Sequence, residues 1–468
     1  MTDDDRTPDE EFQELLRRLM SGGAIDPEQL SRMAGMQMDP AMLSQMMQQF
    51  QGMFAGAQDG SISWDATKRQ ALHLANQDGL GVTDGQRTDL DQAFTLAGLW
   101  LSEATTLSPT AELPRAITRG QWVEQTLPVW QEVAEPVATS IADALTEALR
   151  SQAPEEMQDV VQSAGRLMRG VGGSLFATQL GQVVGKLSLE VVSGSDVGIP
   201  VMPAGTAVLL PQNFAELGAG LEIPDDQLAL YIAARELASA RLFRHAKWLR
   251  LHVLSQIGDY ARGIRVDTDA LEEMASRLDP TNPEELRQAL ESGALLPQQT
   301  EAQQRALARL ENLLALVEGW IDVVTADATS RVPQLDRIAE AIRRRRAEGG
   351  PAEDALGALV GLRLRPRRMR EAAAMWRAVG EAVGISARDS LWDYPDLMPT
   401  SEDIDDPAAL IARLEAQARG EAPAADDLDD ALAQLLREEA DKSEDGPAGG
   451  SQDRDDDPDA RPEGDQPV

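Results

Sequence analysis

Apolar residues recur at intervals of three and four along most of the chain, which is the period of an α-helix with one buried face. The pattern predicts helices in "DATKRQALHLANQ" (65–77), in "TDLDQAFTLAGLWLSEA" (88–104) and in "VWQEVAEPVATSIADALTEAL", a helix that Pro128 and Pro136 punctuate. Further helices are predicted in "DALEEMASRL", "PEELRQALES", "RALARLENLLALVEGWIDVVTADAT", "LDRIAEAIRRRRAE" and "RPRRMREAAAMWRAVGEAVG". The chain is therefore expected to be mainly α.

Two segments depart from this helical pattern. "TAVLLPQNF" (206–214) is the best candidate for a strand, stopped by Pro211, so the fold should hold one or two short strands. The glycine-rich stretch before it has neither a preceding strand nor a Gly-Lys-Ser/Thr ending, so it is not a phosphate loop. Gly181, Gly185 and Thr178 are instead expected on a helix face, where small residues let another helix approach closely.

The composition divides the chain into three parts. Residues 1–60 are acidic and then rich in Met and Gln, which predicts a partly disordered segment that either docks loosely as a helix or binds a partner. Residues 61–419 carry the helical pattern and form the predicted domain. Residues 420–468 are highly charged with few large apolar side chains, and such a tail is expected to be disordered.

Charge and residue usage exclude several classes of function. The formal net charge of −36 disfavours nucleic acid and anionic membranes as partners. No secretory signal or long apolar run is present, which predicts a cytoplasmic protein. The absence of cysteine excludes thiolate metal sites and cysteine nucleophiles, and three histidines leave little scope for a Ser-His-Asp triad. The basic runs "RLRPRRMR" (363–370) and "RRRR" (343–346) are expected to form salt bridges within the protein.

The stretch "AARELASARLFRH" (233–245) has the spacing of the catalytic helix of a zinc protease. In the motif His-Glu-x-x-His, two histidines one helical turn apart bind Zn²⁺ and the glutamate activates a metal-bound water. With Glu236 in the place of that glutamate, Arg235 and Ser239 stand where the histidines belong. Arginine keeps its proton in a protein and repels a dication, and a serine hydroxyl is a poor zinc ligand. A zinc site of the usual kind is therefore not expected.

The wider sequence resembles the actinobacterial zincin-like metallopeptidase type 2 family, whose members are labelled zinc-dependent metalloproteases or hydrolases. The resemblance lies in the stretches beginning "YIAARELASARLFRHAKW" (from 231), "LALVEGWIDVV" (314–324) and "LVGLRLRPRRMREAAAMW" (from 359). It implies a zincin-like helical domain over roughly residues 60–415, in which Glu318 or Asp322 faces the helix that carries Glu236. Of the family's catalytic positions only Glu236 carries over unchanged, as a vestigial general base, while Arg235 and Ser239 mark degenerate ligand positions.

The first interpretation of this site is a pseudoenzyme with no cofactor that binds a peptide or protein. Glu318 and Asp322 are four residues apart and share one helix face, so without a metal they need a neutralising cation. Arg235 is expected to supply it, provided that it lies within hydrogen-bonding range of one of them; the alternative is a solvated Arg235 with no such partner. A scaffolding protein whose cleft is filled by side chains is a further possibility.

The second interpretation is an active zinc-dependent hydrolase with Glu236 as general base. Its ligands would have to come from His245, His252, Glu318 and Asp322. The two histidines are seven residues apart, about 10 Å along a continuous helix, so they would reach one ion only if the helix breaks near Trp248. The third histidine, His73, is expected to be packed in its helix.

Overall fold

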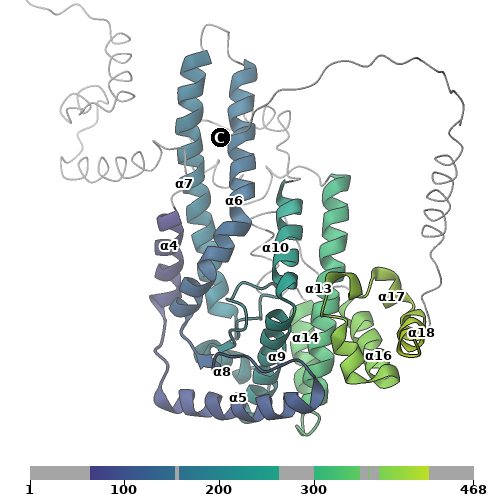
Figure 1. Ribbon diagram of the computed structural model, residues 1–468. Helices are drawn as coiled ribbons and strands as arrows, with labels where there is room; N and C mark the ends of the chain where they lie inside the picture. Colours follow the sequence, from purple (N-terminus) through teal and green to yellow (C-terminus); the bar gives the residue numbers. More distant parts are fainter. Residues whose placement is uncertain (1–63, 153–157, 263–299, 348–356, 358–367, 421–468) are drawn as a thin grey trace, which may run out of the picture. The chain divides into compact units, whose positions relative to one another are not determined.

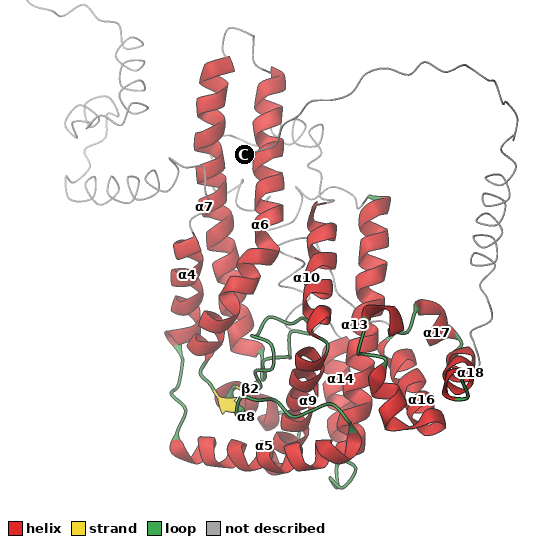
Figure 2. Cartoon of the chain, viewed as in Figure 1, coloured by secondary structure: helices red, strands yellow, loops and turns green. Residues whose placement is uncertain are grey.

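The computed structural model describes residues 64–152, 158–262, 300–347, 357 and 368–420. Within these residues it contains twelve α-helices and two short strands, which confirms the mainly α prediction (Figure 2). The Met- and Gln-rich segment, nearly all of the acidic tail and the helices expected within 270–292 lie outside the described residues. The chain divides into two compact units, Met1–Ala408 and Ala409–Val468, and the candidate site lies in the first.

The elements follow one another along the chain, and Figure 1 labels the α-helices among them. In order they are α4 (Trp64–Gln77), α5 (Asp84–Ala104), β1 (Arg115–Ala116), α6 (Arg119–Gln152), α7 (Gln158–Glu190), β2 (Val208–Leu209), α8 (Pro211–Ala219), α9 (Asp225–His245), α10 (Lys247–Arg262), α13 (Glu301–Ala328), α14 (Leu335–Ala347), α16 (Met369–Ser390), a 3₁₀ turn η2 (Pro395–Leu397), α17 (Ser401–Asp405) and α18 (Pro407–Ala418).

Helices α4 and α7 lie side by side because α7 presents glycines at their contact (Figure 1). A Cβ on Gly181 would come within 2.7 Å of the backbone oxygen of Thr67, and one on Gly185 within 2.8 Å of the Leu74 side chain. The hydroxyl of Thr67 donates a hydrogen bond of 2.7 Å to the carbonyl of Ala177 across the same contact. The predicted close approach at Gly181 and Gly185 is thus confirmed.

Helix α6 continues through both of its prolines, whereas the sequence pattern predicted that they would punctuate it. A proline removes one backbone hydrogen bond and disfavours the helical conformation of the residue before it. The apolar face on either side of Pro128 and Pro136 is buried, with Trp122, Trp130 and Val137 fully enclosed. Burial of this face outweighs the local cost of the prolines.

The strand prediction for 206–214 is only partly right, since β2 covers Val208–Leu209 alone. It pairs in parallel with β1, with Arg115 opposite Val208. Pro211 does more than end the strand: it occupies the first turn of α8, where its missing N–H and fixed φ are tolerated. The following residues are therefore helical.

Helix α9 lies at the centre of the described unit and is buried on every side from Leu228 to Phe243. Helices α5 and α13 both pack against it. Asp389 helps to fix their arrangement: its buried carboxylate accepts hydrogen bonds from the Thr105 hydroxyl at 2.7 Å and from the Trp320 indole N–H at 3.0 Å. This joins the end of α5 and the middle of α13 to the end of α16.

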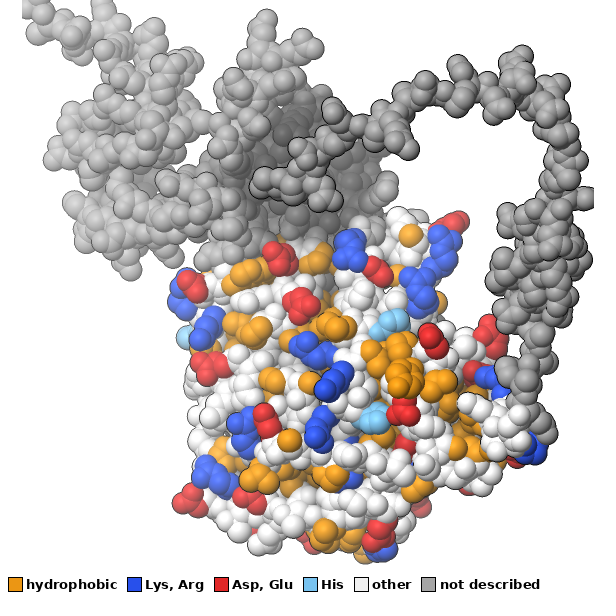
Figure 3. Space-filling view, viewed as in Figure 1, with side chains coloured by type: hydrophobic (Ala, Val, Ile, Leu, Met, Phe, Trp, Pro, Cys, Tyr) orange, Lys and Arg blue, Asp and Glu red, His pale blue; other side chains and the backbone are white. Residues whose placement is uncertain are grey.

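The surface of the described residues is mixed in character. On the face drawn in Figure 3, basic side chains lie among acidic and hydrophobic ones. None of the described helices is both long enough and apolar enough to cross a bilayer.

Substitution of Gly181 by alanine tests the α4–α7 contact. The new methyl group would overlap the backbone of α4, and we expect a loss of about 1 to 3 kcal/mol in the free energy of unfolding, measured by urea denaturation. Gly85→Ala is the matched control: it is also helical, but its Cβ would meet no atom within 4 Å, so this variant should be as stable as the parent or slightly more so. Equal stability of both variants would contradict the close packing.

Candidate functional site

Glu236 lies on α9 with both carboxylate oxygens already engaged. Oε2 accepts hydrogen bonds from the backbone N–H of Ser195 at 2.9 Å and from its hydroxyl at 2.6 Å, and Oε1 accepts one from the N–H of Val208 at 3.0 Å. The side chain is 2% exposed. Burial raises the pKa of Glu236 above its ordinary value of 4.5, although the hydrogen bonds act in the opposite direction. Glu236 is therefore held in place by the backbone of β2 and of the loop before it.

Two glycines of that loop make the arrangement possible. A Cβ on Gly194 would lie 2.7 Å from Oε1 of Glu236, so only glycine allows the chain to pass this close to the carboxylate. Gly198 has a φ of 81°, in the left-handed region that favours glycine, and its Cα lies beside Arg346 and Glu318. The loop thereby contacts Glu236 at one end and Glu318 at the other.

Arg235, at the first ligand position of the motif, donates a hydrogen bond to Oε2 of Glu318. Both side chains are buried, with 9% and 4% of their surfaces exposed. Burial opposes the charge of Arg235, but Glu318 together with Tyr231, Asp322 and Asp196 outweighs it, and the pKa of Arg235 is raised above its usual value. Arg346 of α14 pairs with the other oxygen of Glu318. Arg235 therefore meets the condition set from the sequence, and its partner is Glu318.

Asp322 has a different partner. Its carboxylate accepts hydrogen bonds from Arg343, with Nη2 of Arg343 at 3.0 Å from Oδ2. Arg345, from the same run on α14, pairs with both oxygens of Asp196 at 2.7 Å. Burial raises the pKa of the nearby Tyr231 hydroxyl to about 12. Three arginines of the "RRRR" run thus form salt bridges within the protein, as the sequence predicted.

The donor set does not fit zinc. At the two histidine positions stand Arg235, which keeps its proton, and Ser239, which offers a neutral hydroxyl. The carboxylate that faces them, Glu318, has an arginine on each oxygen. Among the described residues no cluster of three or more His, Asp or Glu side chains has the geometry of a metal site. Asp196, Glu236, Glu318 and Asp322 face Arg235, Arg343, Arg345 and Arg346, so four arginines suffice to balance four carboxyl groups without a metal even when Glu236 is ionised.

The histidines do not join this cluster. The helix does break near Trp248, at Ala246, which separates α9 from α10. Even so, Nε2 of His245 pairs with Asp393 at 2.7 Å, and His252 packs edge-on against the Trp248 ring. His73, expected to be packed, is exposed on α4 beside Gln77, because the buried face of that helix is formed by Thr67, Ala71 and Ala75.

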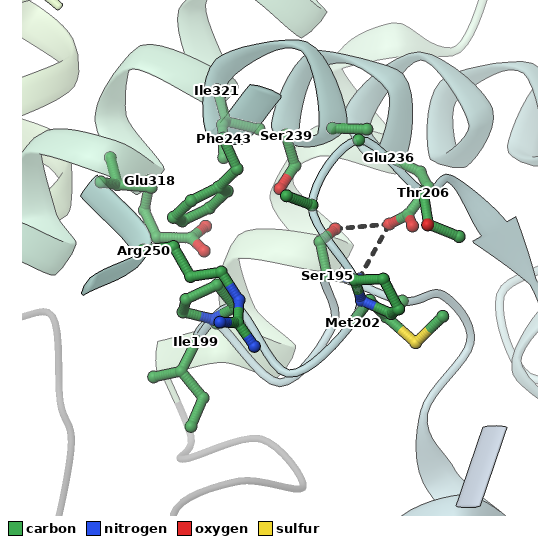
Figure 4. A pocket seen from close by; sticks show the side chains of 18 residues that line it. Ser195, Ile199, Met202, Thr206, Glu236, Ser239, Phe243, Arg250, Glu318 and Ile321 are labelled. Atoms are coloured by element: carbon green, nitrogen blue, oxygen red, sulfur yellow. Dashed lines mark hydrogen bonds between the residues drawn. The ribbon is translucent and has the colours of Figure 1, made fainter. Parts of the chain in front are cut away.

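A pocket opens between α9, α13, the start of α10 and the loop at 194–206 (Figure 4). It encloses about 490 Å³, its open mouth included. Glu236, Ser239 and Glu318 line it together with Arg250, and the rest of its wall is largely apolar, including Ile199, Met202, Phe243, Val317 and Ile321. Of the site positions named from the sequence, Glu236, Ser239 and Glu318 therefore line one cavity, whereas Arg235, Asp322 and the two histidines do not.

The sequence analysis missed two of the segments that hold these residues. It assigned no role to "SGSDVG" (193–198), yet this loop contains the groups that bind Glu236 and Arg345. Alternation of small residues with Ser and Asp is typical of loops rich in free N–H donors, and this was the available signal. Arg250 had no signal of its own in "KWLRLH".

Replacement of Arg235 by methionine tests the buried pair. The change removes a cation from Glu318, and we expect the free energy of unfolding to fall by about 3 kcal/mol, the lower end of the usual range for a broken buried pair, because Arg346 still neutralises the carboxylate. Arg305→Ala, which removes an exposed pair on α13, should cost less than about 1 kcal/mol. Similar losses in the two variants, measured by urea denaturation, would contradict the assignment.

The raised pKa of Glu236 predicts a pH dependence. As the pH rises above 4.5 the unfolded carboxyl ionises first while the buried carboxyl retains its proton, so the unfolded state binds fewer protons and stability falls. This penalty is absent below that pH and complete above the folded pKa. The stability of the parent relative to Glu236→Gln should therefore decline as the pH is raised from about 4 towards 8. Unfolding free energies of both proteins at each pH measure the difference, and a constant difference would contradict the shift.

Two comparisons bear on this arrangement. The model of the zincin-like metallopeptidase family matches residues 62–411, which is most of the chain. Among solved structures, the chain is similar to a candidate hydrolase with a novel fold from Chloroflexus aurantiacus, with 18% sequence identity, a TM-score of 0.52, and coverage of 76% of this chain and 99% of that one. At this identity the similarity concerns the fold alone. A search of curated proteins finds no match.

The matched span includes every residue of the Glu236 site, the arginines of α14 and the helix pair of α9 and α13. The chain belongs to the zincin-like metallopeptidase family.

Proposed function

We propose that this protein is a member of its family without catalytic zinc, and that it acts by binding a peptide or protein segment in the pocket beside Glu236. The single observation that carries the proposal is the pairing of Arg235 with Glu318. Arg235 occupies a ligand position with a permanent positive charge, and it engages the carboxylate that a metal would need. The guanidinium of Arg235 neutralises Glu318 as a metal ion would, but it cannot activate a water molecule.

The state of Glu236 supports the same conclusion. A general base needs a free lone pair directed at the water that it activates. In this protein three donors, from Ser195 and Val208, occupy three of the roughly four lone-pair sites of the Glu236 carboxylate. The carboxylate is therefore suited to holding β2 and the preceding loop against α9, which is a structural task.

The alternative is an active zinc-dependent hydrolase in which Glu236 is the base and the ligands form an unusual set. Family membership is the observation that favours it. It would require His245 or His252 to leave Asp393 or Trp248 and to meet Glu318 or Asp322, which are paired with arginines. At least one histidine contact and one pairing of a carboxylate with arginine would have to change together, and we therefore rank it second.

The class of partner follows from charge and from the pocket. A net charge of −36 opposes nucleic acid and anionic membranes, so a peptide or protein in the cytoplasm is the partner that we propose. The wall of the pocket is largely apolar, which suits an apolar side chain of a peptide or protein at its mouth.

Metal analysis of the purified, tag-free protein tests the proposal. After dialysis against a weak chelator we expect well below one zinc per chain in the parent protein. The variant Arg235→His/Ser239→His restores two imidazoles one helical turn apart and frees one oxygen of Glu318, so it should retain zinc near one per chain. Elemental analysis measures both.

A matched control separates loss of the arginine from gain of the ligands. Arg235→Met/Ser239→Ala removes the same cation and adds no donor, so it should stay free of zinc. Zinc near one per chain in the parent protein would overturn the proposal and favour the hydrolase.

A further inference from the structure

Arg250 lines the pocket itself and pairs with no carboxylate among the described residues, although its Nε shares with that of Arg346 the lack of a hydrogen-bond partner. The guanidinium groups of Arg235, Arg343, Arg345 and Arg346 each pair with a carboxylate. Arg250, on α10, lines the pocket, and its Nε is buried with no hydrogen-bond partner in the described part of the chain. A buried guanidinium nitrogen without an acceptor is costly, so the site calls for an acceptor that the protein itself does not supply.

The electrostatic balance of the pocket points the same way. The four arginines of the cluster balance its four carboxyl groups even when Glu236 is ionised, and Arg250 adds a further positive charge. Glu318 also lines the pocket, but its two oxygens are held by Arg235 and Arg346. An excess positive charge thus faces an open cavity in a protein whose net charge is −36. The pocket is suited to an anion.

The remaining groups of the wall specify which anion. Ser239 directs its hydroxyl into the cavity, towards the same space as Arg250 (Figure 4). This hydroxyl makes no hydrogen bond within the described residues and is free to donate one. Around these two polar groups stand apolar side chains, including Ile199, Phe243 and Ile321. Inorganic phosphate would leave this apolar surface without a partner, whereas a carboxylate attached to an apolar group would cover it.

We infer that the pocket binds the carboxylate of a peptide next to an apolar side chain, with Arg250 as the cation that recognises it. The planar guanidinium matches a carboxylate in a two-point arrangement, and Ser239 donates a further hydrogen bond to it. The apolar side chain of the peptide packs on Phe243 and Ile321. The carboxylate belongs either to the C-terminus of the peptide or to an Asp or Glu side chain. This inference rests on the proposed function, since it names the chemistry that the binding site recognises.

Peptide pairs that differ only in charge test the inference. The full-length protein is titrated by calorimetry with N-acetyl-Ala-Ala-Leu as the free acid and as the C-terminal amide, and with N-acetyl-Ala-Asp-Leu-amide, which carries its carboxylate on a side chain. We expect the free acid or the aspartate peptide to bind about tenfold or more tightly than the uncharged amide, because a charge-assisted pair is lost in the amide. Whichever charged peptide binds more tightly identifies the source of the carboxylate.

Variants of Arg250 connect the preference to this residue. In Arg250→Gln the preference for the charged peptide should disappear, and in Arg250→Lys part of it should persist. Since Arg250 has no partner to lose in the described residues, Arg250→Gln should unfold at the same urea concentration as the parent, which a structural role would not allow. Arg262→Gln on the same helix is the control: Arg262 pairs with Asp259 on the surface, and its replacement should leave binding unchanged.

Each other outcome overturns the inference, and the outcomes distinguish it from the proposed function. Equal binding of charged and uncharged peptides would be consistent with peptide binding but would contradict recognition of a carboxylate by Arg250. Displacement of the charged peptide by inorganic phosphate as readily as by N-acetyl-leucine would show a site for any anion. Absence of binding by all the peptides would contradict peptide recognition as well, while the zinc content of the same sample independently decides whether the site is catalytic.

Discussion

The burial of charge on α9 is the constraint on which the rest of the structure depends. This helix is enclosed on every side, yet it carries Arg235, Glu236 and Arg241 within two turns. A buried charge is tolerated only with a partner, so each of these residues requires a neighbouring segment to supply one. Helix α13 supplies Glu318 to Arg235, the 193–196 loop and β2 supply N–H donors to Glu236, and the backbone of α5 at Gly98 accepts a hydrogen bond from Arg241. The elements around α9 are thereby fixed in position by its polar groups as much as by its apolar ones.

The same constraint explains how a metallopeptidase scaffold stays intact with arginine at a ligand position. A divalent ion would have balanced the carboxylates of α13, and without it Glu318 and Asp322 would repel each other across one helical turn. Arg235 and the arginines of α14 restore the balance one charge at a time, and they keep it at every physiological pH because guanidinium does not titrate there. Zinc would instead have to compete with fixed cations for the same oxygens. The same arginines that balance the buried carboxylates thus occupy the oxygens that a metal would need.

Much of the fold could be predicted from the sequence, because the helical period and the small residues at 181 and 185 are local signals. The errors came where a distant contact decides the outcome: burial carries α6 through its prolines, and Pro211 begins a helix that the strand pattern concealed. Within the site, the motif located Glu236 and the expected partner Glu318. It gave no indication that Arg345 would reach Asp196, because those residues are 149 positions apart and only the packed structure brings them together. Nor could it single out Arg250, since a cation without a partner is recognisable only once every neighbouring acid is seen to be engaged.

The pocket itself is the feature that a purely structural role does not explain. A scaffolding protein with its cleft filled by side chains would have a large apolar residue at the second ligand position, since filling a cavity stabilises a core. The residue there is Ser239, which leaves the space open and directs a hydroxyl into it. Arg250 adds a buried donor that no described residue satisfies. Stability alone would favour a sequence without the open space and without the unsatisfied donor. Natural proteins keep such destabilising features mainly at functional sites. An open cavity that combines Arg250, the Ser239 hydroxyl and an apolar wall is therefore the feature of this site that packing alone does not account for.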